Sequence, residues 1–227
     1  MTCAPLRRLA TRAALVSLLL LGGAASAQRA PADVWEADMQ RFAAADRAQP
    51  PAPGGIVFVG SSSIRLWTGL AEDFPGRHVL NRGFGGSTIA DATQHVDQLV
   101  TRYTPRTIVF YAGDNDLAAG AAPAQVRADF DAFVRAVRER LPDARILFVS
   151  IKPSPSRIAL LPAMREANAL IRDDARQLNN VGYVDVFAPM LDAQGRPRAE
   201  LFGADGLHMN RAGYALWVSI ITPALDG

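Results

Sequence analysis

Four short segments carry side chains that could act together in hydrolysis. Three consecutive serines occupy positions 61–63, and a glycine-rich segment, NRGFGGST, spans residues 81–88. Residues 113–116 read GDND, and residues 205–210 read DGLHMN. A serine hydroxyl is a poor nucleophile near neutral pH, so it needs a histidine base, a carboxylate that orients the base, and hydrogen-bond donors for the oxyanion that develops. The four segments together contain a group of each kind.

Each segment alone also has a structural interpretation. Serines that follow a strand often cap a helix, and GFGG is typical of a turn that needs positive φ. Gly83 and Gly85 could begin a dinucleotide-binding pattern, but Thr88 stands where its third glycine belongs. GDND could form an Asx-turn, or provide calcium ligands through Asp114 and Asp116. The chain lacks the G-x-S-x-G motif of the common α/β-hydrolases.

Five apolar runs predict the strands that position these segments. They are short, rich in β-branched and aromatic residues, and apolar on both faces: residues 56–59, 78–81, 107–112, 145–151 and 181–187. Such runs favour a parallel sheet covered on both sides. In an open α/β sheet, ligands bind beyond the carboxyl ends of the strands. The serine, glycine-rich and GDND segments each follow a run, so we expect them to share one edge of the sheet.

Helical patterns alternate with these runs. Residues 33–47 suggest a short amphipathic helix, which the proline- and glycine-rich residues 48–55 end. Apolar residues recur at helical spacing over residues 126–141, over residues 164–178 and from residue 210 to about 223. The alternation predicts an α/β fold: a single three-layer, doubly wound, flavodoxin-like domain with a five-stranded parallel sheet.

On these residues the sequence resembles the SGNH (GDSL-type) hydrolases, from about residue 56 to 220. FVGSSSIRLW, NRGFGGST, GDND and DGLHMN are similar to the family's blocks, in family order. The resemblance favours the branch that contains the catalytic subunits of platelet-activating-factor acetylhydrolase. That branch also carries an Arg-Glu-x-Asn stretch like residues 165–168, which we interpret as helix packing.

The resemblance implies a role for each candidate residue. Ser62 would be the nucleophile, His208 the base and Asp205 the acid that orients it. The oxyanion donors would be the backbone N–H groups of Ser62 and Gly86 and the side-chain amide of Asn115. No metal or organic cofactor is implied. The expected substrate is a small-molecule carboxylic ester with a short acyl group such as acetyl.

The first block departs from the family at one position. The family wording is Gly-Asp-Ser, whereas this chain has Ser61 before Ser62. Ser61 therefore lacks the acidic side chain that helps to hold this turn in the family, although its hydroxyl can still accept a weaker backbone hydrogen bond. Ser63 is the alternative nucleophile if the register differs by one residue.

Two other functions remain open at this point: a non-catalytic ligand- or glycan-binding domain on the same fold, and a nucleotide-binding protein. Arg82 could meet an acidic group of a substrate or pair with an acid of the protein, and residues 152–162 are the segment expected to shape specificity. Four apolar residues are candidates for an acyl pocket, with the core as the alternative: Trp67, Phe84, Leu201 and Phe202.

The first 27 residues have the pattern of a signal peptide, with a buried N-terminal helix as the alternative. Three arginines precede or border the apolar residues 13–21, which are too few to span a bilayer, and Ala25-Ser26-Ala27 fits a cleavage site. The predicted organisation is a leader (1–27), an N-terminal helix and linker (28–55) and a hydrolase domain (56–227). Cleavage after Ala27 predicts a periplasmic or secreted protein.

The predicted mature chain has an almost balanced charge. It holds 21 basic and 22 acidic residues, and it lacks the basic patch that binding of nucleic acid requires. The single cysteine, Cys3, lies in the leader, so the mature chain can form no disulfide. We expect no nucleic-acid partner and no membrane span after cleavage.

Overall fold

A central sheet of five parallel strands organises the part of the chain that the computed structural model describes, residues 1–2 and 34–227. Apart from its first two residues, the predicted signal peptide lies outside the described residues. The strands are β1 (Ile56–Gly60), β2 (Val79–Gly83), β3 (Thr107–Tyr111), β4 (Arg145–Val149) and β5 (Val181–Val184). Their order in the sheet is β2-β1-β3-β4-β5, and every neighbouring pair is parallel. The predicted parallel α/β sheet is confirmed.

Side chains of each strand alternate between two apolar cores. In β1, Val57 and Val59 pack into one core, whereas Ile56 and Phe58 pack into the other. β3 and β4 show the same alternation. Because both faces of these strands are buried, the runs are apolar at every position rather than at every second one.

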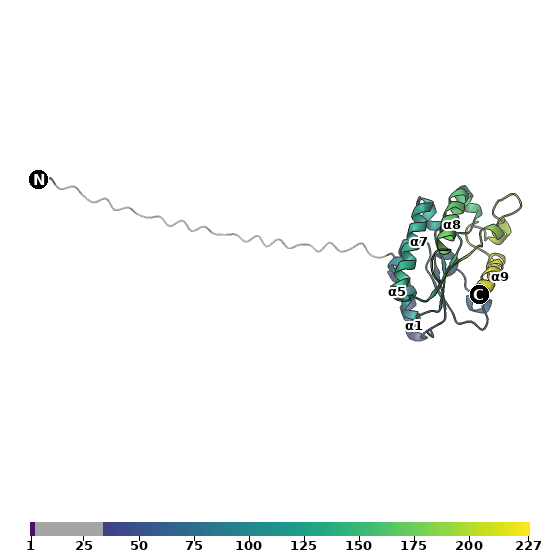
Figure 1. The fold of residues 1–227 in the computed structure, drawn as a ribbon, viewed down its shortest axis with the longest axis horizontal. Coiled ribbons are helices and arrows are strands. Elements are labelled where there is room, and N and C mark those ends of the chain that lie inside the picture. The colour runs from purple at the N-terminus through teal and green to yellow at the C-terminus, as the bar shows by residue number, and fades with distance from the viewer. Residues whose placement is uncertain (3–33) are drawn as a thin grey trace. The chain divides into compact units, whose positions relative to one another are not determined.

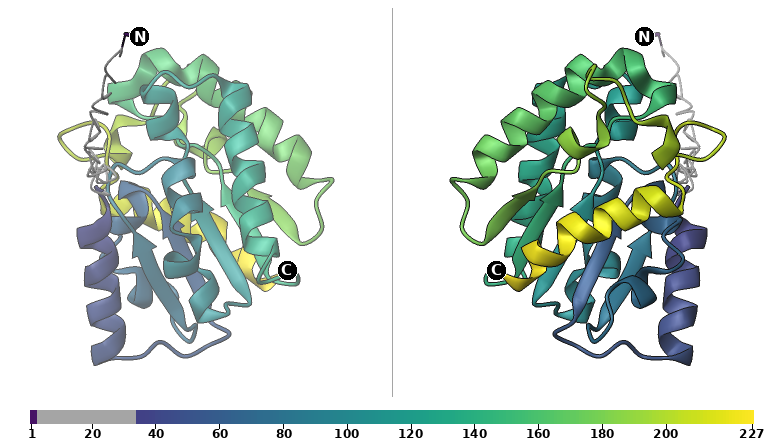
Figure 2. Two further views of the ribbon diagram at one scale, coloured as in Figure 1. Left: turned by 90° about the vertical axis from the view of Figure 1, so that its left-hand side faces the viewer. Right: turned by 90° about the vertical axis from the view of Figure 1, so that its right-hand side faces the viewer.

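Helices cover both faces of the sheet and make the outer two layers. The α-helices are α1 (Glu36–Ala48), α2 (Ser62–Arg65), α3 (Leu70–Asp73), α4 (Ile89–Gln94), α5 (Val96–Leu99), α6 (Asp114–Ala118), α7 (Pro123–Arg138), α8 (Leu161–Ala175) and α9 (Arg211–Asp226). Short 3₁₀ helices are η1 (Thr101–Tyr103), η2 (Pro155–Leu160), η3 (Ala188–Met190) and η4 (Ala199–Leu201). Figures 1 and 2 show α7 and α8 on one face and α9 crossing the opposite face. None of the described helices has the length and apolar character needed to cross a membrane.

Three predicted strands end earlier than their apolar runs, β3 by a single residue. β4 stops at Val149 and β5 at Val184. Beyond β4, the Ser150 hydroxyl accepts hydrogen bonds from the backbone N–H groups of Val186 (2.9 Å) and Phe187 (3.0 Å). These side-chain bonds replace the ladder, so the chain leaves the sheet while it stays buried.

Helix α1 belongs to the compact unit formed by residues 34–227. Phe42 packs into the core, and Asp46 forms an ion pair with the buried Arg82. The Arg82 guanidinium also lies over the rings of Phe42 (4.9 Å) and Tyr103 (4.7 Å). Of the two interpretations of Arg82, the structure supports pairing with an acid of the protein.

The end of β1 requires glycine, and this requirement can be tested. Gly60 has φ +141°, and a Cβ there would lie 1.8 Å from the carbonyl oxygen of Tyr111. Gly120 has φ +92° with open space around it. We expect Gly60→Ala to lower the free energy of unfolding by more than about 4 kcal/mol. The matched control Gly120→Ala should lose only about 1–2 kcal/mol from backbone strain. Denaturant unfolding measures both, and equal losses would contradict the steric argument.

Candidate active site

Three predicted residues, one near the start of the domain and two near its end, contact one another in series. Ser62 is the first residue of α2, and its Oγ lies 3.0 Å from Nε2 of His208. Nδ1 of the same imidazole lies 2.6 Å from Oδ2 of Asp205. The order hydroxyl, imidazole, carboxylate suits removal of the serine proton by the imidazole and stabilisation of the resulting imidazolium by the carboxylate.

A tight turn holds the carboxylate and the imidazole together. Oδ1 of Asp205 accepts hydrogen bonds from the backbone N–H groups of Leu207 (2.9 Å) and His208 (3.0 Å), and Gly206 adopts φ +61°. These backbone bonds, together with the imidazole, hold the pKa of Asp205 well below its usual range. Asp205 is therefore ionised, and one of its oxygens shapes the turn while the other meets His208.

The turn that carries Ser62 is fixed mainly by backbone contacts. The Ser61 N–H donates to the carbonyl of Tyr111 (3.1 Å), and the Phe84 N–H donates to the carbonyl of Gly60 (2.9 Å). A Cβ at Gly83 would lie 2.1 Å from the backbone nitrogen of Arg65, so only glycine allows β2 to pass this close to α2.

The structure separates the three serines. Ser62 is half-buried and faces His208, whereas Ser61 and Ser63 are fully buried. Because Ser63 is inaccessible, it does not fit the alternative role of nucleophile. The Ser61 hydroxyl does not use its capacity to accept such a bond: its Oγ makes no hydrogen bond within the described residues, although Ser61 is the N-cap of α2. The backbone bonds around Gly60 hold the turn without it.

Gly86 and Asn115 lie beside Ser62 and His208 in one cleft of about 460 Å³. Gly86 adopts φ +79° in the loop that follows β2. Asn115, in α6, donates from Nδ2 to the carbonyl of Ser87 (2.9 Å) in that same loop. The cleft is lined by Asp38, Ser62, Arg65, Gly85, Gly86, Asn115, Arg157, Leu207 and His208. The structure thus brings together all the predicted site residues except Asp205, which reaches the cleft through His208.

The two acids of GDND have protein partners that do not fit calcium. Oδ2 of Asp114 lies 3.1 Å from both Nζ of Lys152 and Nη1 of Arg157. Oδ1 of Asp116 accepts from the backbone N–H of Ile89 (3.0 Å) and joins this loop to the glycine-rich one. Two cations already meet the charge of Asp114, and among the described residues no group of three or more His, Cys, Asp or Glu side chains could hold a metal ion here.

Thr88 explains why the glycine-rich segment departs from the dinucleotide pattern. It is the N-cap of α4, where its side chain and that of Asp91 form a reciprocal capping box. A glycine there could not provide this side chain, so the segment is built to begin a helix.

Several residues of the cleft were not predicted. Asp38 comes from α1, and Arg65 lies one turn after Ser62. Arg157 comes from η2, inside the 152–162 segment that the sequence indicated only as a whole. The four candidates for an acyl pocket are instead buried in the two cores: Trp67, Phe84, Leu201 and Phe202.

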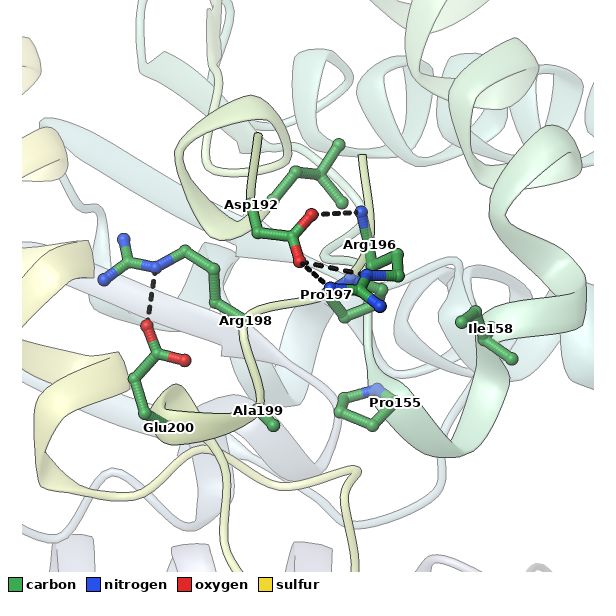
Figure 3. A pocket seen from close by; sticks show the side chains of 9 residues that line it. Pro155, Ile158, Asp192, Arg196, Pro197, Arg198, Ala199 and Glu200 are labelled. Atoms are coloured by element: carbon green, nitrogen blue, oxygen red, sulfur yellow. Dashed lines mark hydrogen bonds and ion pairs between the residues drawn. The ribbon is translucent and has the colours of Figure 1, made fainter. Parts of the chain in front are cut away.

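A second hollow, of about 630 Å³, lies beside η2, but none of the predicted catalytic or oxyanion-hole residues lines it. Figure 3 shows that its charged side chains pair with one another, Asp192 with Arg196 and Arg198 with Glu200. Because these charges are already paired, the hollow offers no chemistry comparable to that of the cleft at Ser62.

Comparison with known proteins identifies the family of this chain. The family model of the GDSL-like lipases/acylhydrolases matches residues 54–216, most of the chain. The chain belongs to this family. It is an α/β serine hydrolase of the GDSL type, as the resemblance implied.

Individual GDSL-family relatives are distant. Subunit alpha1 of human (Homo sapiens) platelet-activating factor acetylhydrolase IB is 29% identical over 208 residues, which cover 79% of this chain and 78% of the relative. A GDSL-like lipase from Bacteroides thetaiotaomicron superimposes with a TM-score of 0.71 at 20% identity, covering 84% and 98% of the two chains. A variant of an acetyl-xylooligosaccharide esterase from Geobacillus gives 0.63 at 14% identity, covering 78% and 96%. The two solved structures share the fold.

The isolated hydroxyl of Ser61 gives a stability prediction. We expect Ser61→Ala to change the free energy of unfolding by less than about 0.5 kcal/mol, because no hydrogen bond is lost. Ser150→Ala is the matched control: Ser150 is also fully buried, but it accepts two backbone N–H bonds. It should cost about 1–3 kcal/mol. A large loss in Ser61→Ala alone would show that its hydroxyl does hold the turn.

Asp116 makes stability depend on pH. Burial raises its pKa to about 6 from the ordinary 3.8, so the folded protein binds the proton more tightly than the unfolded chain. Its contribution to stability is therefore present below pH 3.8 and is lost as the pH rises toward 6. Asp116→Asn stays neutral, so it should be more stable than wild type by up to about 3 kcal/mol at pH 7.5. Urea unfolding at pH 4 and 7.5 measures this gain, and an equal difference at both would contradict it.

Proposed function

We propose that the protein hydrolyses carboxylic esters through an acyl-enzyme on Ser62. The observation that carries the proposal is the alignment of Ser62 Oγ, both nitrogens of His208 and the ionised Asp205. A non-catalytic binding domain would not need a hydroxyl placed on a base in this way.

The steps follow from this geometry. Nε2 of His208 takes the Ser62 proton while Oγ bonds to the ester carbonyl carbon, and the carbonyl oxygen becomes an oxyanion. The backbone N–H groups of Ser62 and Gly86 and the Asn115 amide stabilise that charge. The imidazolium then protonates the departing alkoxide, which leaves as an alcohol. Water, deprotonated by His208, attacks the acyl-enzyme and releases the carboxylic acid and free Ser62.

The lining of the cleft favours a short acyl group. Leu207 provides an apolar side chain, whereas the other lining residues are glycine or carry polar or charged groups. A long acyl chain gains about 0.8 kcal/mol for each CH₂ that it buries, and it needs apolar walls to do so. We infer that acetyl or a similarly small acyl group is the substrate's reacting part.

We also propose that residues 1–27 direct export to the periplasm or the outside of the cell and are removed after Ala27. The basic start, the apolar residues 13–21 and the Ala25-Ser26-Ala27 site support this. N-terminal sequencing of the protein recovered from cell fractions tests it. A mature chain that begins at Gln28 outside the cytoplasm is expected, and an intact Met1 terminus would refute the proposal.

Ester hydrolysis provides the central test. The purified protein should hydrolyse p-nitrophenyl acetate faster than the octanoate. Ser62→Ala should lower kcat for both by at least about a thousandfold, since no nucleophile remains. Ser219→Ala, an exposed serine on α9, is the matched control and should keep full activity.

A fluorophosphonate probe checks the nucleophile directly. It should label wild type on Ser62 and fail to label Ser62→Ala. Activity or labelling that survives in this variant would contradict the acyl-enzyme, and a preference for octanoate would contradict the short acyl group.

A further inference from the structure

A buried cation lies behind the oxyanion side of the cleft. Lys152 is only 1% exposed, and its Nζ lies 3.1 Å from Oδ2 of Asp114 and 3.2 Å from the hydroxyl of Tyr111. The same Asp114 oxygen lies 3.1 Å from Nη1 of Arg157. Two cations thus share one carboxylate, and the group of three side chains carries a net positive charge.

Burying these three charged side chains costs free energy, so the cluster is a poor way to stabilise the fold. Burial by itself raises the pKa of Asp114, but Lys152 and Arg157 outweigh it, so the pKa is lowered and the carboxylate is ionised. Removing charges from water costs several kcal/mol per ion, and apolar packing would often stabilise the same space as well. The position of the cluster beside the cleft suggests a contribution to function.

Arg157 connects the cluster to Asn115. Nη2 of Arg157 donates to Oδ1 of Asn115 (2.9 Å), while Nδ2 of Asn115 donates to the carbonyl of Ser87 (2.9 Å). Because the Asn115 oxygen accepts from Arg157 and its nitrogen donates to Ser87, the Asn115 amide can adopt only one of its two flipped orientations. One Nδ2 hydrogen is used by Ser87, so the second remains available to a ligand in the cleft.

The segment that carries Lys152 and Arg157 is anchored at both ends. The buried Asn168 of α8 accepts from the N–H of Ile151 (2.8 Å) and donates to its carbonyl (2.9 Å), which fixes the residue before Lys152. The N–H of Ser156 donates to the carbonyl of Gly206 (3.0 Å), inside the turn of Asp205 and His208. Arg157 therefore lies in a segment that contacts both Asn115 and the turn of Asp205 and His208.

We propose that Arg157, held by the buried pair Lys152–Asp114, is a positioning residue for ester hydrolysis. It fixes the Asn115 amide so that one hydrogen points at the carbonyl oxygen of the substrate. This inference rests on the proposed function. It assigns Lys152 and Asp114 an indirect role, and it gives the 152–162 segment a part in the reaction through the contact of Arg157 with Asn115.

Kinetics with p-nitrophenyl acetate test the inference. Arg157→Met should lower kcat about tenfold with little change in KM, because the transition state loses more than the ground state does. Asn115→Ala should lower kcat about 100-fold or more. In the Asn115→Ala background, Arg157→Met should cause almost no further loss, because Arg157 acts through the missing amide. Arg157→Lys keeps the charge but not the fork, and should lie between wild type and Arg157→Met.

A matched control separates this role from the loss of any arginine pair. Arg127 of α7 pairs with Asp174 of α8, away from the cleft. Arg127→Met should leave kcat and KM unchanged. If thermal melting shows that Arg157→Met does not fold, Arg157→Lys carries the same comparison in both backgrounds.

Three results would overturn the inference: an unchanged kcat in Arg157→Met, a change confined to KM, or an equal loss of kcat with and without Asn115. The last result would mean that Arg157 acts on the substrate by itself. Failure of the proposed function is distinguishable, because the wild type would then show no hydrolysis that depends on Ser62, and both proposals would fall.

Discussion

The close approach of backbone at the carboxyl ends of β1 and β2 is the constraint on which the site depends. A side chain at Gly60 would meet the carbonyl of Tyr111, and one at Gly83 would meet the backbone of Arg65. Because neither glycine has a side chain, the N–H groups of Ser61 and Phe84 reach the carbonyls of neighbouring strands. This close backbone packing sets where α2 begins, and the side chains of Asn81 and Tyr214, which donate to the carbonyls of Ile64 and Ser63, help to hold the helix there.

Polar contacts between loops then complete the arrangement. Asp116 joins the loop after β3 to the start of α4, and Asn115 joins the same two loops one residue earlier. The Asp205 turn is shaped by its own backbone bonds, and the carbonyl of Gly206 joins it to η2 by accepting from the N–H of Ser156. The site is thus assembled from four segments, the turn of Ser62 and these three loops, and the hydrogen bonds between them limit how far any one can move independently.

The sequence predicted what local patterns determine. The apolar runs identified all five strands, most clearly the three central ones, whose two faces are both buried, and the family blocks identified Ser62 and His208. Partners that depend on tertiary packing were not predictable. Lys152 and Arg157 meet Asp114 across 38 and 43 positions, and no local pattern signals such a pairing. Composition could not distinguish an acyl pocket from the core either, and residues such as Trp67 and Phe84 proved to be core.

The pairing of acid and base within one turn has a consequence for synthesis of the chain. Asp205 and His208 are encoded about 140 residues after Ser62, whereas the glycine-rich and GDND loops lie between them. During translation, the hydroxyl and the oxyanion donors leave the ribosome first, and the imidazole follows late. If the proposed mechanism holds, an incomplete chain that lacks His208 cannot hydrolyse the esters of the cell that makes it. Activity begins only after β5 and the loop that follows it have been made and the turn of Asp205 and His208 has packed against Ser62.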